Sequence, residues 1–297
     1  MKRFKTILVG LGKIGFYYDI KKQKSNLTHI KSLKKITKID VVCGVDINKK
    51  TIFDFKKNYN IEVSTNLAFA LKKYQPEFVV VSVNTANLYK ILMIISKFKS
   101  VKKVLVEKPG AENFDQIKKI LKVYFKNKIK LYVNYNRSYQ QKILNIFSLL
   151  KKNNFKIVYF YNRGILNNCS HLLNLIFLYQ DLPYKIKILD KGKKFGKDLQ
   201  PDLELKFKKG TIYLLKNQNN SVVHNELFFL SGNYKINSNN KFNQFIKFKL
   251  DKDKYLKRYK SYKPVKKILI DERKYQSNVY EKVLNNKKSY DLIIVTD

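Results

Sequence analysis

Short apolar runs alternate with amphipathic segments along the first 134 residues, and this alternation predicts strands that alternate with helices. The apolar runs are rich in β-branched residues, as expected of strands buried on both faces of a parallel sheet: 7–9, 41–45, 61–64, 78–83, 101–106 and 129–134. The predicted helices between them cover residues 13–20, 51–59, 67–74, 88–98 and 114–125. This order is typical of a doubly wound α/β sheet.

The pattern changes after residue 135. Residues 140–152 and 171–179 have helical spacing, and residues 156–161 form a β-rich run. Apolar and charged residues then alternate around two turns, which predicts hairpins from residues 203–207 with 211–215 and 226–230 with 233–236. We therefore expect two domains: a doubly wound α/β domain over 1–135 and an α+β domain with a mainly antiparallel sheet over 136–297.

Three glycines follow the first strand with G-x-G-x-x-G spacing: Gly10, Gly12 and Gly15, with Lys13 and Ile14 before the last. Glycine lets the chain turn sharply and lets a pyrophosphate approach the backbone, as in the Rossmann fold. The N-terminus of a following helix would favour the phosphate charge. A plain strand connection also uses such glycines, so the motif by itself leaves both interpretations open.

Asp46 ends the second predicted strand, where a carboxylate can accept hydrogen bonds from the adenosine ribose. It lies 46 − 15 = 31 residues after Gly15, whereas about 20 is typical. A polar insertion at 21–28 accounts for much of the excess. A carboxylate repels a 2′-phosphate, so we expect NAD, with NADP as the alternative because Lys49 and Lys50 are near.

Asn84, Glu107 and Lys108 also follow predicted strands. Ligands of doubly wound sheets bind at the carboxyl ends of the strands, so these residues are expected to share one crevice with Gly10 and Asp46. An ammonium held there can bind a substrate hydroxyl. The competing interpretation is that Lys108 is one surface lysine among many.

Three segments together resemble the glucose-fructose oxidoreductase and inositol dehydrogenase family, also called Gfo/Idh/MocA. They are the glycine turn 9–15, the triplet Glu107-Lys108-Pro109, which matches the family's Glu-Lys-Pro hallmark, and residues 165–175, which resemble its D-x-x-x-H segment. Their order and spacing fit over nearly the whole chain. The triplet and the later histidine are together far more specific than the glycines.

The resemblance implies hydride transfer between a nicotinamide cofactor and a secondary alcohol of a sugar, nucleotide sugar or polyol. By the same resemblance, Lys108 contacts the reacting hydroxyl and His171 is the base, whose ordinary pKa of about 6.5 suits proton transfer. The substrate is then a small sugar-like molecule, with phosphorylated and nucleotide-linked forms included.

The chain departs from the family at Asn167 and Asn174, where aspartates are usual, and at Asn87, where many relatives have histidine. A neutral amide stabilises an imidazolium less than a carboxylate does, although Asn167 can still orient the His171 ring. The predicted catalytic residues are Lys108, His171 and Asn167. A non-catalytic dinucleotide-binding sensor or scaffold of the same fold is the alternative.

The formal net charge is +40, a value that would ordinarily suggest nucleic acid or an acidic membrane as a partner. The lysines are spread over nearly every segment, as AT-rich codons would produce. We therefore expect no specific nucleic-acid partner, and only a general preference for anionic ligands. A basic nucleic-acid-binding protein remains a third hypothesis.

No run of 18 apolar residues occurs, so we expect a cytoplasmic protein without a membrane partner. Cys43 and Cys169 lack C-x-x-C partners and are expected to be small buried residues, and no metal site is expected. His29 and His224 are assigned structural or surface roles. The resembled family commonly forms subunit contacts through the open sheet face of its second domain, which implies a homo-oligomer.

Overall fold

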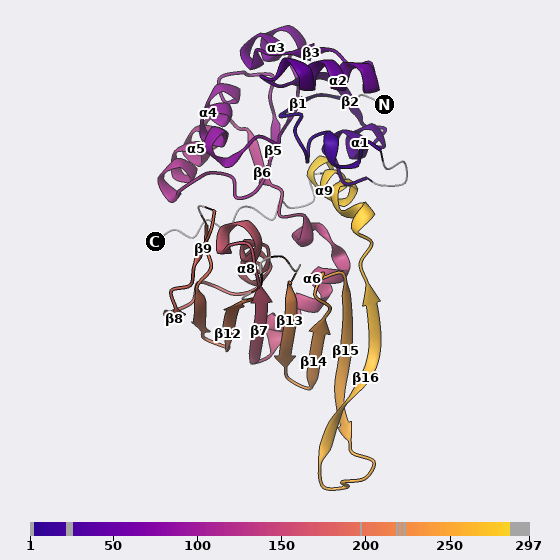
Figure 1. Ribbon diagram of the computed structural model, residues 1–297, viewed down its shortest axis with the longest axis vertical. Coiled ribbons are helices and arrows are strands. Elements are labelled where there is room, and N and C mark those ends of the chain that lie inside the picture. Colours follow the sequence, from indigo (N-terminus) through magenta and orange to yellow (C-terminus); the bar gives the residue numbers. More distant parts are fainter. Residues whose placement is uncertain are drawn as a thin grey trace. The chain divides into compact units, whose positions relative to one another are not determined.

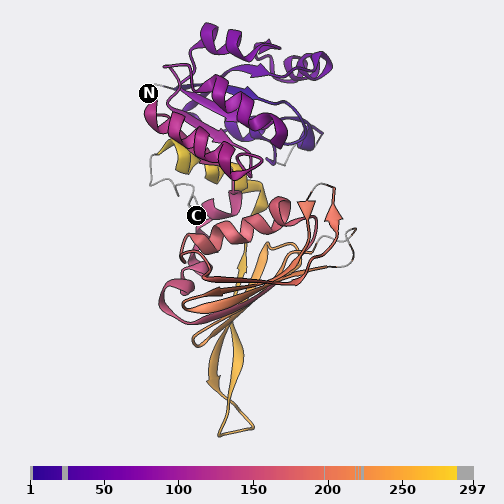
Figure 2. The ribbon, with the colours of Figure 1, turned by 90° about the vertical axis from the view of Figure 1, so that its left-hand side faces the viewer.

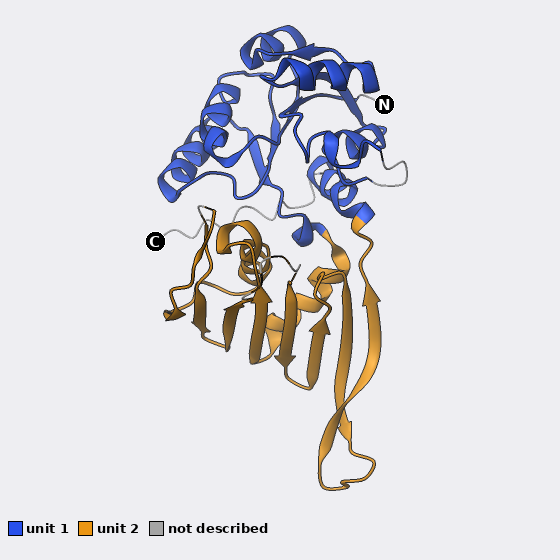
Figure 3. Cartoon of the chain, in the orientation of Figure 1, with its two compact units in different colours: residues 1–139, 273–292 blue, residues 140–272, 293–297 orange. Residues whose placement is uncertain are grey.

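The computed structural model describes residues 3–21, 26–196, 198–217, 219, 221 and 224–285. The chain forms two compact units (Figure 3), and the described residues divide between them as follows. The first unit contains the chain up to Tyr139 and again from Arg273, and the second contains Gln140–Glu272. From the sequence, all residues after 135 are predicted to belong to the second domain. In the structure, the C-terminal helix instead belongs to the first unit.

The first unit contains a six-stranded parallel sheet in the order β3-β2-β1-β4-β5-β6 (Figure 1). The strands are β1 Phe4–Val9, β2 Ile39–Val45, β3 Val63–Ser64, β4 Phe78–Val81, β5 Lys103–Val106 and β6 Lys130–Val133. Val9 is level with Val45 on one side and with Val81 on the other, so the carboxyl ends of the central strands coincide. The predicted doubly wound sheet is confirmed.

Helices pack on both faces of this sheet. α3 Leu67–Tyr74, α4 Thr85–Ile95 and α5 Phe114–Lys126 share one apolar core with it. α1 His29–Lys34, α2 Lys49–Tyr59 and α9 Tyr275–Leu284 share the other. Because the apolar side of α9 completes this second core, the C-terminal helix belongs to the first unit.

Four of these helices begin at an asparagine whose side chain accepts a backbone N–H three residues on: Asn48, Asn66, Asn84 and Asn113. Each cap satisfies a donor that the first helical turn leaves unpaired, and stabilises the helix by about 1 kcal/mol. The caps therefore fix the residue at which each helix begins after the preceding strand or loop.

Among the described residues, no helix is both long and apolar enough to cross a bilayer.

The helix predicted over residues 13–20 is replaced by a turn and the short 3-10 helix η1 Tyr17–Asp19. Asp19 is buried and accepts hydrogen bonds from both the backbone N–H and the hydroxyl of Thr28. A continuing helix would carry Asp19 away from these donors. The chain therefore closes the insertion first, and α1 begins only at His29.

The second unit contains an eight-stranded sheet in the order β16-β15-β14-β13-β7-β12-β11-β8. Its strands are β7 Phe155–Tyr161, β8 Lys185–Asp190, β11 Asp202–Phe207, β12 Gly210–Lys216, β13 Glu226–Ser231, β14 Tyr234–Ser238, β15 Gln244–Lys252 and β16 Lys260–Leu269. Among the strand pairs in the described residues of this sheet, only β7 and β12 are parallel. The predicted mainly antiparallel sheet and both predicted hairpins are confirmed.

One face of the eight-stranded sheet carries the helices α6 Gln141–Phe147, α7 Leu149–Lys152 and α8 Ser170–Phe177 (Figure 2). Alternate strand residues are buried on that face, including Ile157, Tyr159, Ile212, Leu227 and Phe229. A two-stranded sheet of β9 Lys194–Phe195 and β10 Asp198–Leu199 lies apart from it. The opposite face of the large sheet has no helix among the described residues, and its side chains are partly exposed.

Candidate functional site

The glycines after β1 have different surroundings. Gly10 has a φ of +87°, and a Cβ atom there would lie 2.7 Å from the backbone of Ser82. A Cβ atom at Gly15 would lie 2.2 Å from the carbonyl oxygen of Gly10. At Gly12, a Cβ atom would meet nothing within 4 Å. Gly10 and Gly15 therefore permit close packing of the chain on itself, and Gly12 borders open space where a ligand can approach.

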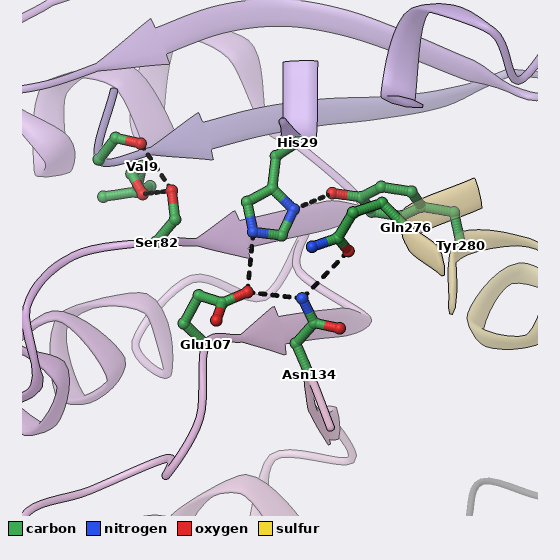
Figure 4. Close-up of polar contacts among 8 residues, drawn as sticks. Val9, His29, Ser82, Glu107, Asn134, Gln276 and Tyr280 are labelled. Atoms are coloured by element: carbon green, nitrogen blue, oxygen red, sulfur yellow. Dashed lines mark hydrogen bonds and ion pairs between the residues drawn. The ribbon is translucent and has the colours of Figure 1, made fainter. Parts of the chain in front are cut away.

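Ser82 holds the turn in place. Its hydroxyl donates a hydrogen bond of 2.6 Å to the carbonyl oxygen of Gly10, and a longer one to that of Val9 (Figure 4). The sequence analysis assigned no role to Ser82, and its position at the end of an apolar strand was the only available signal.

Asp46 lies at the end of β2 and is tied to the glycine turn. Its Oδ2 accepts the backbone N–H of Leu11 at 2.8 Å, and its Oδ1 accepts that of Asn48 at 2.9 Å. A carboxylate offers about four lone-pair positions, so both oxygens retain acceptor capacity. Asp46 can thus orient the turn and still accept hydroxyl groups of a ribose.

A cavity of about 240 Å³ opens beside Asp46. It is lined mainly by apolar residues, together with the predicted site residues Gly10 and Asp46 and with Asn87: Val9, Gly10, Val45, Asp46, Ile47, Thr65, Leu67, Val83, Asn87, Lys90 and Ile91. It is smaller than the roughly 300–1,000 Å³ of pockets for whole drug-sized ligands. Its size and apolar walls suit a group about as large as one nucleoside.

Asn84 caps α4 immediately beyond β4, where its side-chain oxygen accepts the backbone N–H of Asn87 at 3.2 Å. Val83 and Asn87, on either side of it in the sequence, line the cavity. Lys13 and Ile14 lie in the turn between Gly12 and Gly15. The first unit thus brings the predicted cofactor residues of β1, β2 and β4 to one edge of the sheet.

Glu107 follows β5 and belongs to a polar cluster (Figure 4). Its Oε1 lies 3.0 Å from Nε2 of His29 and accepts a hydrogen bond of 2.5 Å from the amide of Asn134. The other ring nitrogen of His29 lies 2.5 Å from the hydroxyl of Tyr280, and Asn134 also donates to Gln276 at 3.1 Å. His29 is therefore a buried structural residue that contacts a predicted cofactor residue.

Lys108 follows Glu107 at the carboxyl end of β5 and is half-buried. The peptide bond between Lys108 and Pro109 is cis. Lys108 therefore lies at the same sheet edge as the glycine turn, as expected from the sequence.

Asn167 and His171 belong to the second unit. Asn167 is exposed in the π-helical turn η3 Ile165–Cys169, and its backbone N–H donates to Asp198 of β10 at 2.7 Å. His171 is half-buried in the first turn of α8. Asp198, more than 25 residues further along the chain, supplies a carboxylate to this segment that no local motif indicated.

Cys43 and Cys169 are both buried free thiols, as predicted. Burial raises the pKa of Cys43 to about 12, with a smaller contribution from the charge of Glu62. In the part of the chain that the structure describes, no group of three or more His, Cys, Asp or Glu residues is arranged to hold a metal ion.

The family profile described as "Oxidoreductase family, NAD-binding Rossmann fold" (GFO_IDH_MocA) matches residues 4–135. No curated protein sequence matches the chain. Solved structures share its fold over nearly the whole length at low sequence identity, and three of them illustrate the range.

A putative NADPH-dependent oxidoreductase from Desulfitobacterium hafniense has a TM-score of 0.75 and 13% identity, covering 96% of this chain and 88% of its own. A dehydrogenase (MviM) from Clostridium difficile has a TM-score of 0.71 and 15% identity, covering 97% and 92%. UDP-N-acetylglucosamine 3-dehydrogenase GnnA from Acidithiobacillus ferrooxidans has a TM-score of 0.73 and 10% identity, covering 98% and 92%. Residues 4–135 thus match the Gfo/Idh/MocA oxidoreductase family with its NAD-binding Rossmann fold, and the chain shares its fold with these solved structures along nearly its whole length.

Proposed function

We propose that the protein is an NAD-dependent dehydrogenase acting on a secondary alcohol of a sugar, nucleotide sugar or polyol. The observation that carries the proposal is the hydrogen bond between Leu11 and Asp46, which joins the glycine turn to a carboxylate at the ribose position. The solved relative named UDP-N-acetylglucosamine 3-dehydrogenase supports a sugar or nucleotide-sugar substrate.

The residues of the first unit fit a dinucleotide. The open space beside Gly12 would receive the pyrophosphate, and Asp46 would accept the adenosine ribose hydroxyls. The apolar cavity that includes Ile47 and Leu67 would hold the adenine ring. The nicotinamide ring supplies a hydride acceptor or donor when the cofactor is bound.

Lys108 and His171 carry the proton chemistry in this proposal. The Lys108 ammonium donates a hydrogen bond to the reacting oxygen, which favours the alkoxide character that develops as the alcohol is oxidised. His171 accepts the hydroxyl proton, and Asn167 orients its ring. Because Asn167 carries no charge, we expect a weaker base than the aspartate-paired histidine common in the family.

NAD is favoured over NADP because the Asp46 carboxylate would lie beside a 2′-phosphate and repel it. Lys49 and Lys50 are exposed at the start of α2 and would reduce this repulsion. We therefore expect binding of both cofactors, with NAD the tighter.

The second unit contributes the substrate pocket and a homo-oligomer contact in this proposal. Phe160 and Phe228 lie 6.2 Å apart between ring centroids on the sheet face without helices, and Phe228 and Leu230 are 38% and 40% exposed. In this proposal, these exposed apolar side chains form the protein contact. A second copy of the chain is the occupant we propose.

The test begins with titration of the purified protein with NAD and NADP, followed by a screen of sugars with and without nucleotide groups for cofactor reduction. Lys108→Met and His171→Asn should lower kcat by about a hundredfold or more while NAD affinity is retained. Lys119→Met, an exposed lysine on α5, is the matched control and should have no effect.

Failure of the protein to bind either dinucleotide would overturn the proposal. Tight NAD binding without turnover of any screened sugar would assign the chain to the non-catalytic sensors instead. In that case, substitution of Lys108 would leave every measured property unchanged.

A further inference from the structure

His29, Glu107 and Tyr280 form a buried chain of hydrogen bonds that starts at the C-terminal helix and ends at a strand terminus (Figure 4). The His29 side chain is 1% exposed and that of Glu107 is 17% exposed. A polar group is costly to bury without a partner, so such a chain must be satisfied along its length. Each link of it is short enough to be a hydrogen bond.

The partners determine which atoms carry the protons. A carboxylate only accepts, so Nε2 of His29 is the donor to Glu107. In the neutral ring, Nδ1 then accepts the Tyr280 hydroxyl proton. Burial, and secondarily the charge of Glu107, raises the pKa of Tyr280 well above its ordinary value, so its hydroxyl keeps that proton.

Glu107 presents its two oxygens differently. Oε1 accepts hydrogen bonds from both His29 and Asn134, whereas no residue in the described part of the chain donates a hydrogen bond to Oε2. Asn134 is itself held, because its amide also donates to Gln276 of α9. Two donors on one oxygen fix the rotation of the carboxylate and leave the other oxygen for a ligand.

The order of the strands indicates which half of a bound dinucleotide would lie next to Oε2 of Glu107. Asp46 directly follows β2 on one side of β1, whereas Glu107 directly follows β5, two strands away on the other side. With strands about 4.8 Å apart, β5 lies about 10 Å from β1. A dinucleotide spans the crevice across β1, so Glu107 lies under the half opposite the adenosine.

We infer that His29 is a positioning residue of the cofactor site: with Asn134 it holds Oε1 of Glu107, so that Oε2 accepts a hydrogen bond from the nicotinamide riboside half of NAD. The C-terminal helix takes part through Tyr280 and Gln276. This inference rests on the proposed function, because it requires that the crevice binds a dinucleotide.

The experiment compares two ligands, NAD and ADP, since ADP lacks the nicotinamide riboside half. His29→Leu and Glu107→Ala should each weaken NAD binding by about tenfold to a hundredfold, the loss expected for a hydrogen bond to a charged group. ADP affinity should stay within about twofold of the wild type. In the double variant, NAD affinity should fall no further than in Glu107→Ala, because His29 acts through Glu107.

Tyr280→Phe keeps the buried ring and removes only the hydroxyl, so it tests the chain if His29→Leu does not fold. It should weaken NAD binding by a smaller factor, with ADP affinity unchanged. Tyr124→Phe is the matched control, since Tyr124 is equally buried and donates to the carbonyl oxygen of Leu92 on the opposite face of the sheet. It should leave both affinities unchanged.

Equal losses of NAD and ADP affinity would overturn the inference and make the cluster purely structural. Unchanged NAD affinity in Glu107→Ala, or additive losses in the double variant, would do the same. If the wild-type protein binds ADP but not NAD, this inference also fails. Binding of neither ligand would instead refute the proposed function itself.

Discussion

The backbone N–H of Leu11 donates a 2.8 Å hydrogen bond to Oδ2 of Asp46, 35 residues further along the chain. One carboxylate therefore anchors the glycine turn and lies at the proposed ribose position. Leu11 and Asp46 can meet despite the long spacing between Gly15 and Asp46, because Thr28 donates two hydrogen bonds to Asp19. These bonds join the segments on either side of the intervening insertion.

Asp46→Asn should lower NAD affinity by about tenfold, since a neutral amide is a weaker acceptor for ribose hydroxyls than a carboxylate. NADP affinity should rise at the same time, because the repulsion of the 2′-phosphate is removed. Fluorescence titration with both cofactors measures the change. Asp40→Asn, an exposed position on the same strand, should alter neither value.

Gly12→Ala and Gly15→Ala should separate binding from folding. A methyl group at Gly12 meets no protein atom within 4 Å, so thermal stability should be unchanged while NAD affinity falls at least about tenfold. At Gly15 the methyl group would lie 2.2 Å from a backbone oxygen. That variant should lose about 1–3 kcal/mol of unfolding free energy.

Thermal melts and NAD titrations of the two glycine variants measure these effects. A stable Gly15→Ala protein would show that the turn relaxes freely. Normal NAD binding by Gly12→Ala would show that the open space beside that glycine is not the pyrophosphate site.

Replacing Phe228 and Leu230 together by aspartate should convert the predicted homo-oligomer to a monomer. Two charges on the open sheet face cannot be buried in a contact without partners, so association becomes unfavourable by several kcal/mol. Light scattering over a range of concentrations measures the mass. Phe125→Asp, at an 88% exposed position on α5, is the control and should leave the mass unchanged.

A monomeric wild-type protein across that range would contradict the oligomer prediction. An unchanged mass in the double variant would locate the subunit contact elsewhere.

Stability should decline at alkaline pH because of Cys43. Its pKa rises from 9.0 to about 12 on folding, so the folded protein binds the thiol proton more tightly than the unfolded chain. The stabilising contribution is complete below pH 9 and is lost as the pH rises toward 12. Each pH unit in that window costs about 1.4 kcal/mol per such group.

Urea titrations at pH 8, 9 and 10 measure this decline. Tyr124, Tyr139, Tyr161 and Tyr280, whose pKa values burial also raises, add to it only above pH 10. Cys43→Ala should therefore have a shallower slope between pH 9 and 10. Equal slopes in the two proteins would show that the thiol ionises as readily in the folded state as in the unfolded one.

Much of the fold follows from local pattern. Helix α3 spans the predicted residues Leu67–Tyr74, and the strands that end at Val9, Val45 and Val106 lie within one residue of the predicted ends. These elements are encoded in windows of a few residues by apolar periodicity, so a single sequence is enough to find them. The helix predicted over residues 13–20 does not form, because the hydrogen bonds between Asp19 and Thr28 outweigh the local helical spacing.

In the candidate site, too, some residues were predicted from local pattern, whereas other contacts depend on the packing of distant elements. Gly12, Asp46 and Glu107 were predicted from residue type and strand position alone. The contact of His29 with Tyr280 joins residues 251 apart in sequence, and Asp198 reaches Asn167 from a strand 31 residues later. Nothing local marks either contact, because each exists only once packing has brought separate elements together.

The sequence by itself determined the alternation of strands and helices, the glycine turn and the acidic and lysine residues at the strand ends. Only the tertiary structure decided that helix α9 returns to the first unit and that His29 and Asn134 hold Glu107. The physical reason is that backbone propensity and hydrophobic period act over a few residues. The partner of a buried polar group is chosen by the whole packed core.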